Sequence, residues 1–422
     1  MNNKTRFLAR TAALRPGRTS RLLATSVATA LCAPAFAVEP PVVDEGVARV
    51  LDAFNPYVTV GYGYDSNIFR LPAASDPCIS INSCSKDDTI YTTALGFILD
   101  VPYSLQRFQA SYTWLDHRYR RFDDLDHQGH VGRAAWLWSV TPRLTGELSY
   151  DDREGLASFA NIQGRRPDMV TQRMALANAA WIVLPSWRLH GAANWGEARH
   201  TGELRVNDIE LEALEAGVSY VTAQENRVGL AVRGERGRNP NDFAIGGIPF
   251  NNEYEQASVG VQGRWVISGL SRFDGRIDYT KREYDRFTDR DYSGMTFNFT
   301  HTYTPTGKFT IATIAQRDVA PLVDITSSFV LVTGITVRPD WAVTEKINVR
   351  GHFAYARWEY FGVEPITPDY EHRVKTAGVT IMYRPTRRIA LSGGVAREER
   401  SSSLNNADYK VDTAFIEGRI GF

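Results

Sequence analysis

The stretch RFDGRIDYTKR, Arg272–Arg282, decides the fold class. Its even-numbered positions carry charged residues and one Thr, whereas up to position 279 its odd-numbered positions carry no charge: Phe273, Gly275, Ile277 and Tyr279. Because successive side chains of a β-strand leave opposite sides of the backbone, this alternation predicts a two-faced strand. In a soluble sandwich the apolar face would be buried, whereas in a transmembrane barrel it would face lipid and the charges would line water. The rest of the chain has to separate these alternatives.

The composition favours a β-rich chain without a nucleic-acid partner. The 422 residues suffice for two or three soluble domains or one large barrel. The 48 basic and 48 acidic residues cancel to a formal net charge of zero, so nothing indicates nucleic acid. The 19 Tyr, 20 Phe, 9 Trp and 33 Gly are typical of strands and tight turns. Past the N-terminus there is no run of about 18 apolar residues, which excludes helical membrane spans.

The N-terminus has the pattern of an export signal. A long basic region precedes the short apolar segment Leu22–Pro34, and Ala35-Phe36-Ala37 is an A-x-A cleavage site. We therefore expect residues 1–37 to be a signal peptide. We do not expect a lipoprotein, because a bulky Leu31 precedes Cys32 where a small residue is required.

Two cysteines follow that cleavage site, Cys78 and Cys84. In an exported protein, a local disulfide between them is favoured over two free thiols. The sequence supports metal binding even less, because two Cys without a nearby His supply too few ligands.

Short turns divide the remaining chain at intervals of roughly forty residues, the length of two membrane-crossing strands and one loop. Pro occurs in several of them, because it cannot donate to a strand ladder. The predicted turns are Pro102–Ser104, Thr141–Arg143, Pro185–Trp187, Thr222–Glu225, Ser268–Ser271, Thr304–Gly307, Pro339–Trp341 and Pro385–Arg387. A propeller shares this period but needs four strands per blade and more turns.

These eight turns, with nine longer polar loops, imply eighteen strands. The predicted strands are 54–69, 88–101, 106–122, 128–140, 144–155, 169–184, 188–200, 208–222, 226–238, 252–267, 272–285, 291–303, 308–318, 325–338, 343–360, 371–384, 388–400 and 409–422. An even number with short turns on one side and long loops on the other is typical of a bacterial outer-membrane barrel.

We therefore predict an all-β protein. A short periplasmic leader, 38–53, precedes a transmembrane antiparallel β-barrel of about 18 strands, 54–422, with short periplasmic turns and longer extracellular loops. Many apolar faces end in an aromatic residue near a short turn, where an interfacial girdle belongs: Tyr220, Trp265, Tyr303 and Tyr383. Outer-membrane lipid is then one partner.

The last predicted strand ends in an aromatic residue, Phe422, and Ile420 lies on the same face. A terminal aromatic on an alternating strand resembles the signal that the outer-membrane insertion machinery reads. That machinery is therefore an expected partner during assembly.

Sequence motifs for catalysis or metal binding are missing. We find no GxSxG, HExxH, P-loop or CxxC motif, and the eight His are scattered. The segment Phe122–His130, FDDLDHQGH, either binds a cation or forms a polar hairpin loop, and the loop explains it better. We expect a protein that is not an enzyme and that holds no cofactor and no metal.

The predicted inner faces carry charges of both signs, as cross-strand pairing inside a large barrel requires. For most of these residues, a mutually neutralised wall is favoured over contact with a ligand. A lumen of about 16–18 strands leaves an aqueous passage that suits hydrated sugars. The candidates for the lining are Arg133, Glu147, Asp151, Arg153, His190, Asn194, Glu215, Arg227, Arg233, Glu235, Arg264, Arg272, Asp274, Arg276, Asp278, Arg350, His352, Glu417 and Arg419.

The first predicted strand has the most specific local sequence, with an Asn55-Pro56-Tyr57 opening and the run Tyr64-Asp65-Ser66-Asn67-Ile68-Phe69-Arg70-Leu71. It resembles the exosortase-associated exopolysaccharide-biosynthesis outer-membrane proteins (EpsL type), within a wider group of β-barrel porins. The resemblance implies a role in exporting polysaccharide, with periplasmic polysaccharide-export components as partners. It supplies no catalytic or binding residues. Alternatively, Asp65, Ser66 and Asn67 only end the lipid-facing band and begin the first loop.

The sequence thus leaves three functions in order of preference. The first is a channel that passes exopolysaccharide, the second is a general or solute-uptake porin, and the third is a barrel with a structural or hydrolytic role. Only the family resemblance separates the first from the second.

Overall fold

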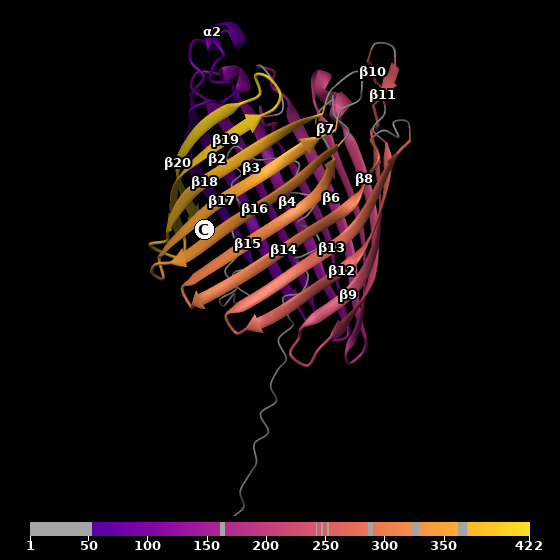
Figure 1. Ribbon diagram of the computed structural model, residues 1–422. Helices are drawn as coiled ribbons and strands as arrows, with labels where there is room; N and C mark the ends of the chain where they lie inside the picture. Colours follow the sequence, from indigo (N-terminus) through magenta and orange to yellow (C-terminus); the bar gives the residue numbers. More distant parts are fainter. Residues whose placement is uncertain are drawn as a thin grey trace, which may run out of the picture.

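The computed structural model describes residues 53–160, 165–241, 243–245, 248–250, 253–285, 290–321, 329–361 and 369–422. The predicted signal peptide and nearly all of the predicted leader therefore lie outside the described residues. Eighteen antiparallel strands form one sheet that closes on itself into a barrel (Figure 1). No helix in the described part of the chain is long and apolar enough to cross a membrane.

Strands that follow one another in the chain are neighbours in the wall, and β1 pairs with β20 to close it. The wall consists of β1 (Phe54–Asp65), β2 (Asp88–Tyr103), β3 (Gln106–Tyr119), β4 (His127–Thr141), β5 (Leu144–Leu156), β6 (Met169–Leu184), β7 (Trp187–His200), β8 (Ile209–Val221), β9 (Arg227–Arg238), β12 (Tyr254–Ser268), β13 (Ser271–Tyr284), β14 (Tyr292–Thr306), β15 (Phe309–Pro321), β16 (Phe329–Ala342), β17 (Ile347–Tyr360), β18 (Tyr370–Tyr383), β19 (Ile389–Ser402) and β20 (Tyr409–Gly421). The prediction of an eighteen-stranded antiparallel barrel is confirmed.

The two ends of the barrel differ, as the sequence predicts. One end has short turns, such as residues 142–143 between β4 and β5. The other end has longer connections with small elements of their own, which Figure 1 places above the wall. These elements are α2 (Pro77–Ser80), the 3-10 helices η2 (Asp123–Leu125) and η3 (Gly202–Asn207), and the hairpin of β10 (Phe243–Ile245) and β11 (Ile248–Phe250). We call the two ends the turn end and the loop end.

One predicted turn is wrong. Pro339–Trp341 lies inside β16, and the turn follows at residues 343–346. The pairing of β16 with β17 skips Arg338 and Pro339, which fits a residue that has no N–H to donate. The neighbouring strand makes room for the ring with Gly351, where a Cβ atom would lie 2.7 Å from Cγ of Pro339. A proline that an adjacent glycine accommodates cannot be told from a turn proline by sequence.

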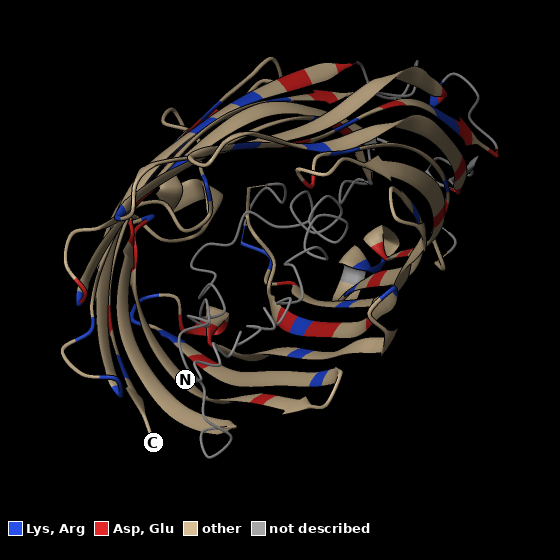
Figure 2. Cartoon of the chain, turned by 90° about the horizontal axis from the view of Figure 1, so that it is seen from below, with Lys and Arg blue, Asp and Glu red and all other residues tan. Residues whose placement is uncertain are grey.

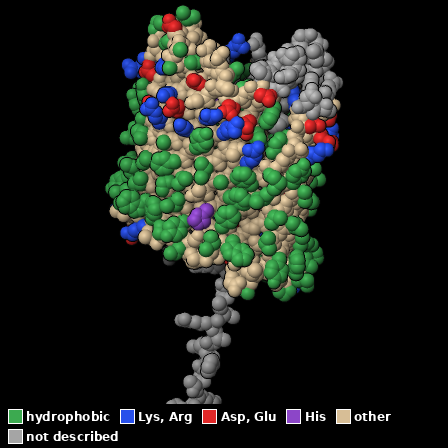
Figure 3. Space-filling view, in the orientation of Figure 1, with side chains coloured by type: hydrophobic (Ala, Val, Ile, Leu, Met, Phe, Trp, Pro, Cys, Tyr) green, Lys and Arg blue, Asp and Glu red, His purple; other side chains and the backbone are tan. Residues whose placement is uncertain are grey.

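The outer face of the wall is apolar in a continuous band. On β1, Val60 is 58% exposed whereas its neighbour Thr59 is 6% exposed, so successive residues alternate between outside and inside. Figure 3 shows hydrophobic side chains gathered over the lower part of the barrel, with charged side chains above them towards the loop end. The predicted girdle aromatics all lie exposed near the turn end: Tyr220, Trp265, Tyr303 and Tyr383.

The opening stretch lies in β13, and its orientation follows from the same alternation. Ile277 and Tyr279 are exposed on the outer face, whereas Asp274, Asp278 and Arg282 are buried on the inner one. An exposed apolar band suits hydrocarbon, and the charged face then lies inside. The transmembrane alternative therefore replaces the soluble sandwich.

Candidate functional site

The inner face of the wall is the candidate functional surface, because the register carries the polar side chains to it. Opposite pairs on adjacent strands include Arg264 with Asp274, and Arg350 with Asp340. The same alternation places eleven of the predicted lumen residues on this face: Arg133, Glu147, Arg233, Arg264, Arg272, Asp274, Arg276, Asp278, Arg350, Glu417 and Arg419. Figure 2, seen from the turn end, shows acidic and basic residues distributed around the ring. Contact of these residues with a solute stays a prediction.

Most of these charges are neutralised within the wall. Arg133 donates from Nη1 to Asp151 Oδ2 at 2.7 Å and from Nη2 to Glu147 Oε1 at 3.0 Å. Arg350 Nε donates to Asp340 Oδ2 at 2.9 Å. Cross-strand pairs of this kind stabilise a sheet and hold long side chains against it.

A buried network joins β7, β8, β12 and β13. Arg276 donates from Nη1 to Glu215 Oε2 at 2.5 Å and from Nε to Asp278 Oδ2 at 2.5 Å. His190 Nε2 lies 3.6 Å from Glu215 Oε1 and 2.8 Å from Gln262 Nε2. Burying charges is costly unless each has partners, and these have several. The pairing therefore offsets much of the cost of burying these charges.

Towards the loop end, the network continues through the predicted residues Arg233 and Glu235 to two residues that were not among the predicted lumen candidates, Arg282 and Tyr254. The Arg282 side chain is 0% exposed, and its guanidinium carbon lies 3.8 Å from the centre of the Tyr254 ring. Tyr254 OH donates to Glu235 Oε1 at 2.9 Å, and Arg233 Nη2 donates to Glu235 Oε2 at 2.8 Å. Arg282 is the last even-numbered residue of the opening stretch, so the alternation alone would have identified it as an inner residue.

Towards the turn end, the balance of charge changes. Arg264 Nε and Arg272 Nε both donate to Asp274, at 2.5 and 2.8 Å. Within the described residues, no carboxylate pairs with Arg188 or Arg227 on the same stretch of wall. We call Arg188, Arg227, Arg264 and Arg272 the turn-end arginine group. Arg188 is the member that the sequence analysis missed, because it directly follows a predicted turn residue.

The loop end has a small apolar core of its own. It consists of Ile68, Phe69, Leu71, Ile81, Ile90, Phe122, Leu125 and Phe159, which come from the first three long loops and the strand ends next to them. Cys78 and Cys84 form a disulfide in the first of these loops. The Ser85 hydroxyl, and then the Arg121 guanidinium, hold the pKa of the Asp87 carboxyl below its ordinary value. The ion pair of Asp87 with Arg121, which joins the first two long loops, therefore keeps its charges in mildly acidic solution.

The acidic segment Phe122–His130 consists of a structured loop up to Asp126 and the first residues of β4, and two of its three carboxylates, Asp124 and Asp126, already have partners. Asp124 accepts from Arg165 Nε at 2.8 Å, and Asp126 accepts from the backbone N–H of Tyr119 at 2.7 Å. In the described part of the chain, no group of three His, Cys, Asp or Glu side chains is placed to hold a metal ion. The polar-loop interpretation therefore accounts for these residues.

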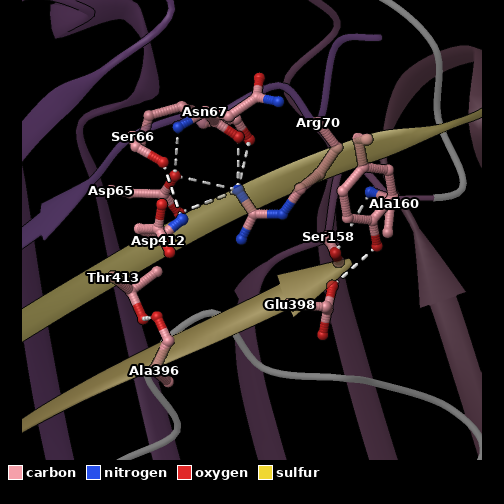
Figure 4. Close-up of polar contacts among 12 residues, drawn as sticks. Asp65, Ser66, Asn67, Arg70, Ser158, Ala160, Ala396, Glu398, Asp412 and Thr413 are labelled. Carbon is pink, nitrogen blue, oxygen red and sulfur yellow. Dashed lines mark hydrogen bonds and ion pairs between the residues drawn. The ribbon is translucent and has the colours of Figure 1, made fainter. Parts of the chain in front are cut away.

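The motif that carries the family resemblance closes the barrel at the loop end (Figure 4). β1 ends at Asp65 rather than at residue 69, because Asn67 turns into the protein and is 0% exposed. Its Nδ2 donates to the carbonyl oxygens of Leu71 at 2.8 Å and Lys410 at 3.2 Å, and its Oδ1 accepts from Leu71 N at 2.9 Å. Lys410 belongs to β20, so Asn67 bridges the first and last strands.

The neighbours of Asn67 strengthen this junction. Ser66 N donates to Asp412 O at 3.0 Å, and Asp412 N donates to Ser66 Oγ at 2.8 Å. Arg70 has a backbone φ of 54° and donates from Nη1 to Asp65 Oδ2 at 2.8 Å. Residues of the motif thus join the end of β1 to β20, and we call this junction the β1–β20 seam.

The last strand closes the turn end of the same seam. Phe422 N donates to Pro56 O at 3.0 Å, and Ile420 lies opposite Val58. Phe422 and Ile420 are both exposed on the outer face. Their recognition by the insertion machinery stays a prediction.

Comparison with known proteins finds a partial match to a porin family. Residues 255–421 match a family model described as "Putative beta-barrel porin 2". No curated protein matches the sequence. Among solved structures, the outer membrane protein OpdK from Pseudomonas aeruginosa is 10% identical, with 87% of this chain and 99% of that chain covered and a TM-score of 0.45. A BenF-like porin from Pseudomonas fluorescens Pf-5 is 10% identical, with 89% and 100% covered and a TM-score of 0.47. Neither likeness assigns a solute to this chain.

The barrel, its apolar belt and the family match lead to one coarse assignment. The protein is a bacterial outer-membrane β-barrel, and residues 255–421 of it resemble a porin family.

The seam makes a testable prediction. Asn67→Ala removes three hydrogen bonds and leaves buried backbone groups without partners, so we expect the free energy of unfolding to fall by about 1–3 kcal/mol. Urea titration of the barrel folded in lipid vesicles, followed by tryptophan fluorescence, measures this change. The matched control is Asn405→Ala in an exposed loop. Equal unfolding free energies for the two variants would contradict the role of Asn67 in the seam.

Proposed function

We propose that the protein is a passive channel for small hydrated solutes, that is, a solute-uptake porin. The observation that carries this proposal is a closed wall of eighteen strands with a polar, ion-paired inner face. Barrels of 16–18 strands are wide enough to leave an aqueous passage.

The chemistry of the inner face supports hydrated rather than apolar solutes. Hydroxyl groups lie between the ion pairs, as in the ladder in which Thr280 Oγ1 lies 3.0 Å from Ser258 Oγ and 2.9 Å from Thr296 Oγ1. These hydroxyls are buried and bond to one another, so they make the wall polar, which favours hydrated over apolar solutes. Paired charges of both signs also keep much of the wall from excluding either cations or anions.

Uptake of small solutes is preferred to export of a polymer because of where the resemblance lies. Asp65, Ser66, Asn67 and Arg70 form hydrogen bonds around the β1–β20 seam, which accounts for the motif without a polysaccharide contact. No other residues distinguish the two functions.

Export of exopolysaccharide is the second candidate, and the first-strand motif is the observation that favours it. In that case periplasmic export components would deliver the polymer to the turn end. Deletion should then abolish extracellular polysaccharide while precursor synthesis inside the cell continues. Normal polymer at the surface of the deletion strain would exclude this function without affecting the uptake proposal.

Reconstitution tests the uptake proposal directly. In planar bilayers with KCl, the full-length protein should give discrete conductance steps, because water and ions share the polar passage. In liposome-swelling assays, small uncharged sugars should enter and large oligosaccharides should not. A barrel that is closed to ions at all voltages and to the smallest sugars would contradict the proposal.

A further inference from the structure

We propose that the turn-end arginine group, together with Ser219, is a binding site for a small oxyanion, a carboxylate or a phosphate group. This inference deepens the proposed function, since the site would lie where a solute passes between the channel and the periplasm.

The site is assembled from a continuous part of the wall. Arg188 is the second residue of β7, and Arg227 is the first residue of β9. Arg264 lies directly opposite Arg227 in the register of β12 with β9. Ser219 lies opposite Arg188 in the register of β7 with β8. All four side chains therefore leave the inner face of adjacent strands near the turn end.

Positive charge in this group exceeds negative charge. Asp274 is the one carboxylate that the described residues place on it, and Arg264 and Arg272 both use that carboxylate. Arg188 and Arg227 lie close enough to Arg264 for the charges to repel one another. Like charges on facing strands are destabilising, so an anion between them would relieve a repulsion that the folded wall otherwise maintains.

Three polar atoms of the proposed site, two from the turn-end arginine group and one from Ser219, have no hydrogen-bond partner among the described residues. The Nε atoms of Arg188 and Arg227 are buried and form no hydrogen bond with any described residue. The Ser219 hydroxyl is also buried and also forms no hydrogen bond with any described residue, and Ser219 as a whole is 1% exposed. Leaving buried donors without acceptors is destabilising, so a bound acceptor would be stabilising.

The Ser219 hydroxyl fits against β9 only because residue 229 is a glycine. A Cβ atom added at Gly229, which is opposite Ser219 on β9, would lie 2.3 Å from Ser219 Oγ. The proposed site therefore contains several hydrogen-bond donors, from Ser219 and the guanidinium groups, and one carboxylate, that of Asp274. Planar guanidinium groups bind the two oxygens of a carboxylate or phosphate side by side, which points to an oxyanion rather than to a halide.

Other arginines of the inner face differ in this respect. Arg133 holds both Asp151 and Glu147, and Arg350 holds Asp340. Their charge is already matched by the wall, so they serve as controls for a general effect of removing positive charge.

The test uses the full-length protein and a double variant, Arg188→Gln/Arg227→Gln. In planar bilayers, succinate and inorganic phosphate are added separately at constant ionic strength on the turn-end side. For the wild type, we expect the KCl current to fall along a saturating curve with one probe or both. For the variant, we expect the half-saturating concentration to rise at least about tenfold, because charge-assisted hydrogen bonds are lost. The matched control, Arg133→Gln/Arg350→Gln, should leave it within about twofold of the wild-type value.

The outcomes separate the possibilities. Saturation with both probes supports a general oxyanion site, and saturation with only one identifies the preferred group. A linear, non-saturating effect, or equal half-saturating concentrations in wild type and variant, would overturn the proposal. Calorimetric titration of the detergent-folded protein with the same probes tests the site even if the channel does not conduct, so the failure of each proposal is distinguishable. Should the double variant not fold, as judged by heat-modifiable electrophoretic mobility, Arg227→Gln alone replaces it.

Discussion

The structure depends on one constraint, which is that backbone N–H and C=O groups cannot be left without partners in hydrocarbon. A sheet satisfies this condition only if it has no edge, so β1 must pair with β20 along the membrane-crossing part of both strands. The chain secures that junction at both ends. Phe422 bonds to Pro56 at the turn end, and Asn67 reaches β20 at the loop end. The first and last strands are the only neighbours in the wall that no direct turn or loop of the chain connects, which explains why side chains are committed to them.

Closure also determines what the side chains do. With apolar residues outside, every second residue points inward, and a wall of this size encloses many charges. The chain stabilises most of them as cross-strand pairs, such as Arg276 with Glu215 and Arg133 with Asp151. The turn-end arginine group departs from this rule, since its positive charges outnumber the acids placed on it. A departure that costs stability is typical of functional sites, and in the proposed channel it lies where a solute would meet the periplasm.

The sequence predicted the number of strands, their direction and the inner face, because each depends on a period of two and on turn residues that are visible locally. It misplaced one turn at Pro339, since the glycine that makes room for that proline is on another strand. It missed Arg188 and Tyr254 as inner residues, and it could not pair Glu215 with Arg276, which are 61 residues apart in the chain. Contacts of that kind depend on the stagger between strands, which no local pattern encodes. The first-strand motif was noticed for its resemblance, whereas its contacts with β20 became visible only in three dimensions.

The apolar face of β13 meets lipid while its charged face lines the interior. Single Cys substitutions at residues 273 to 280, labelled with a small fluorophore in bilayers that contain brominated lipid, test this orientation most directly. We expect strong quenching at the odd-numbered positions, such as Ile277 and Tyr279, and weak quenching at even-numbered ones, such as Asp278 and Thr280. Quenching without alternation, or stronger at the even-numbered positions, would contradict it.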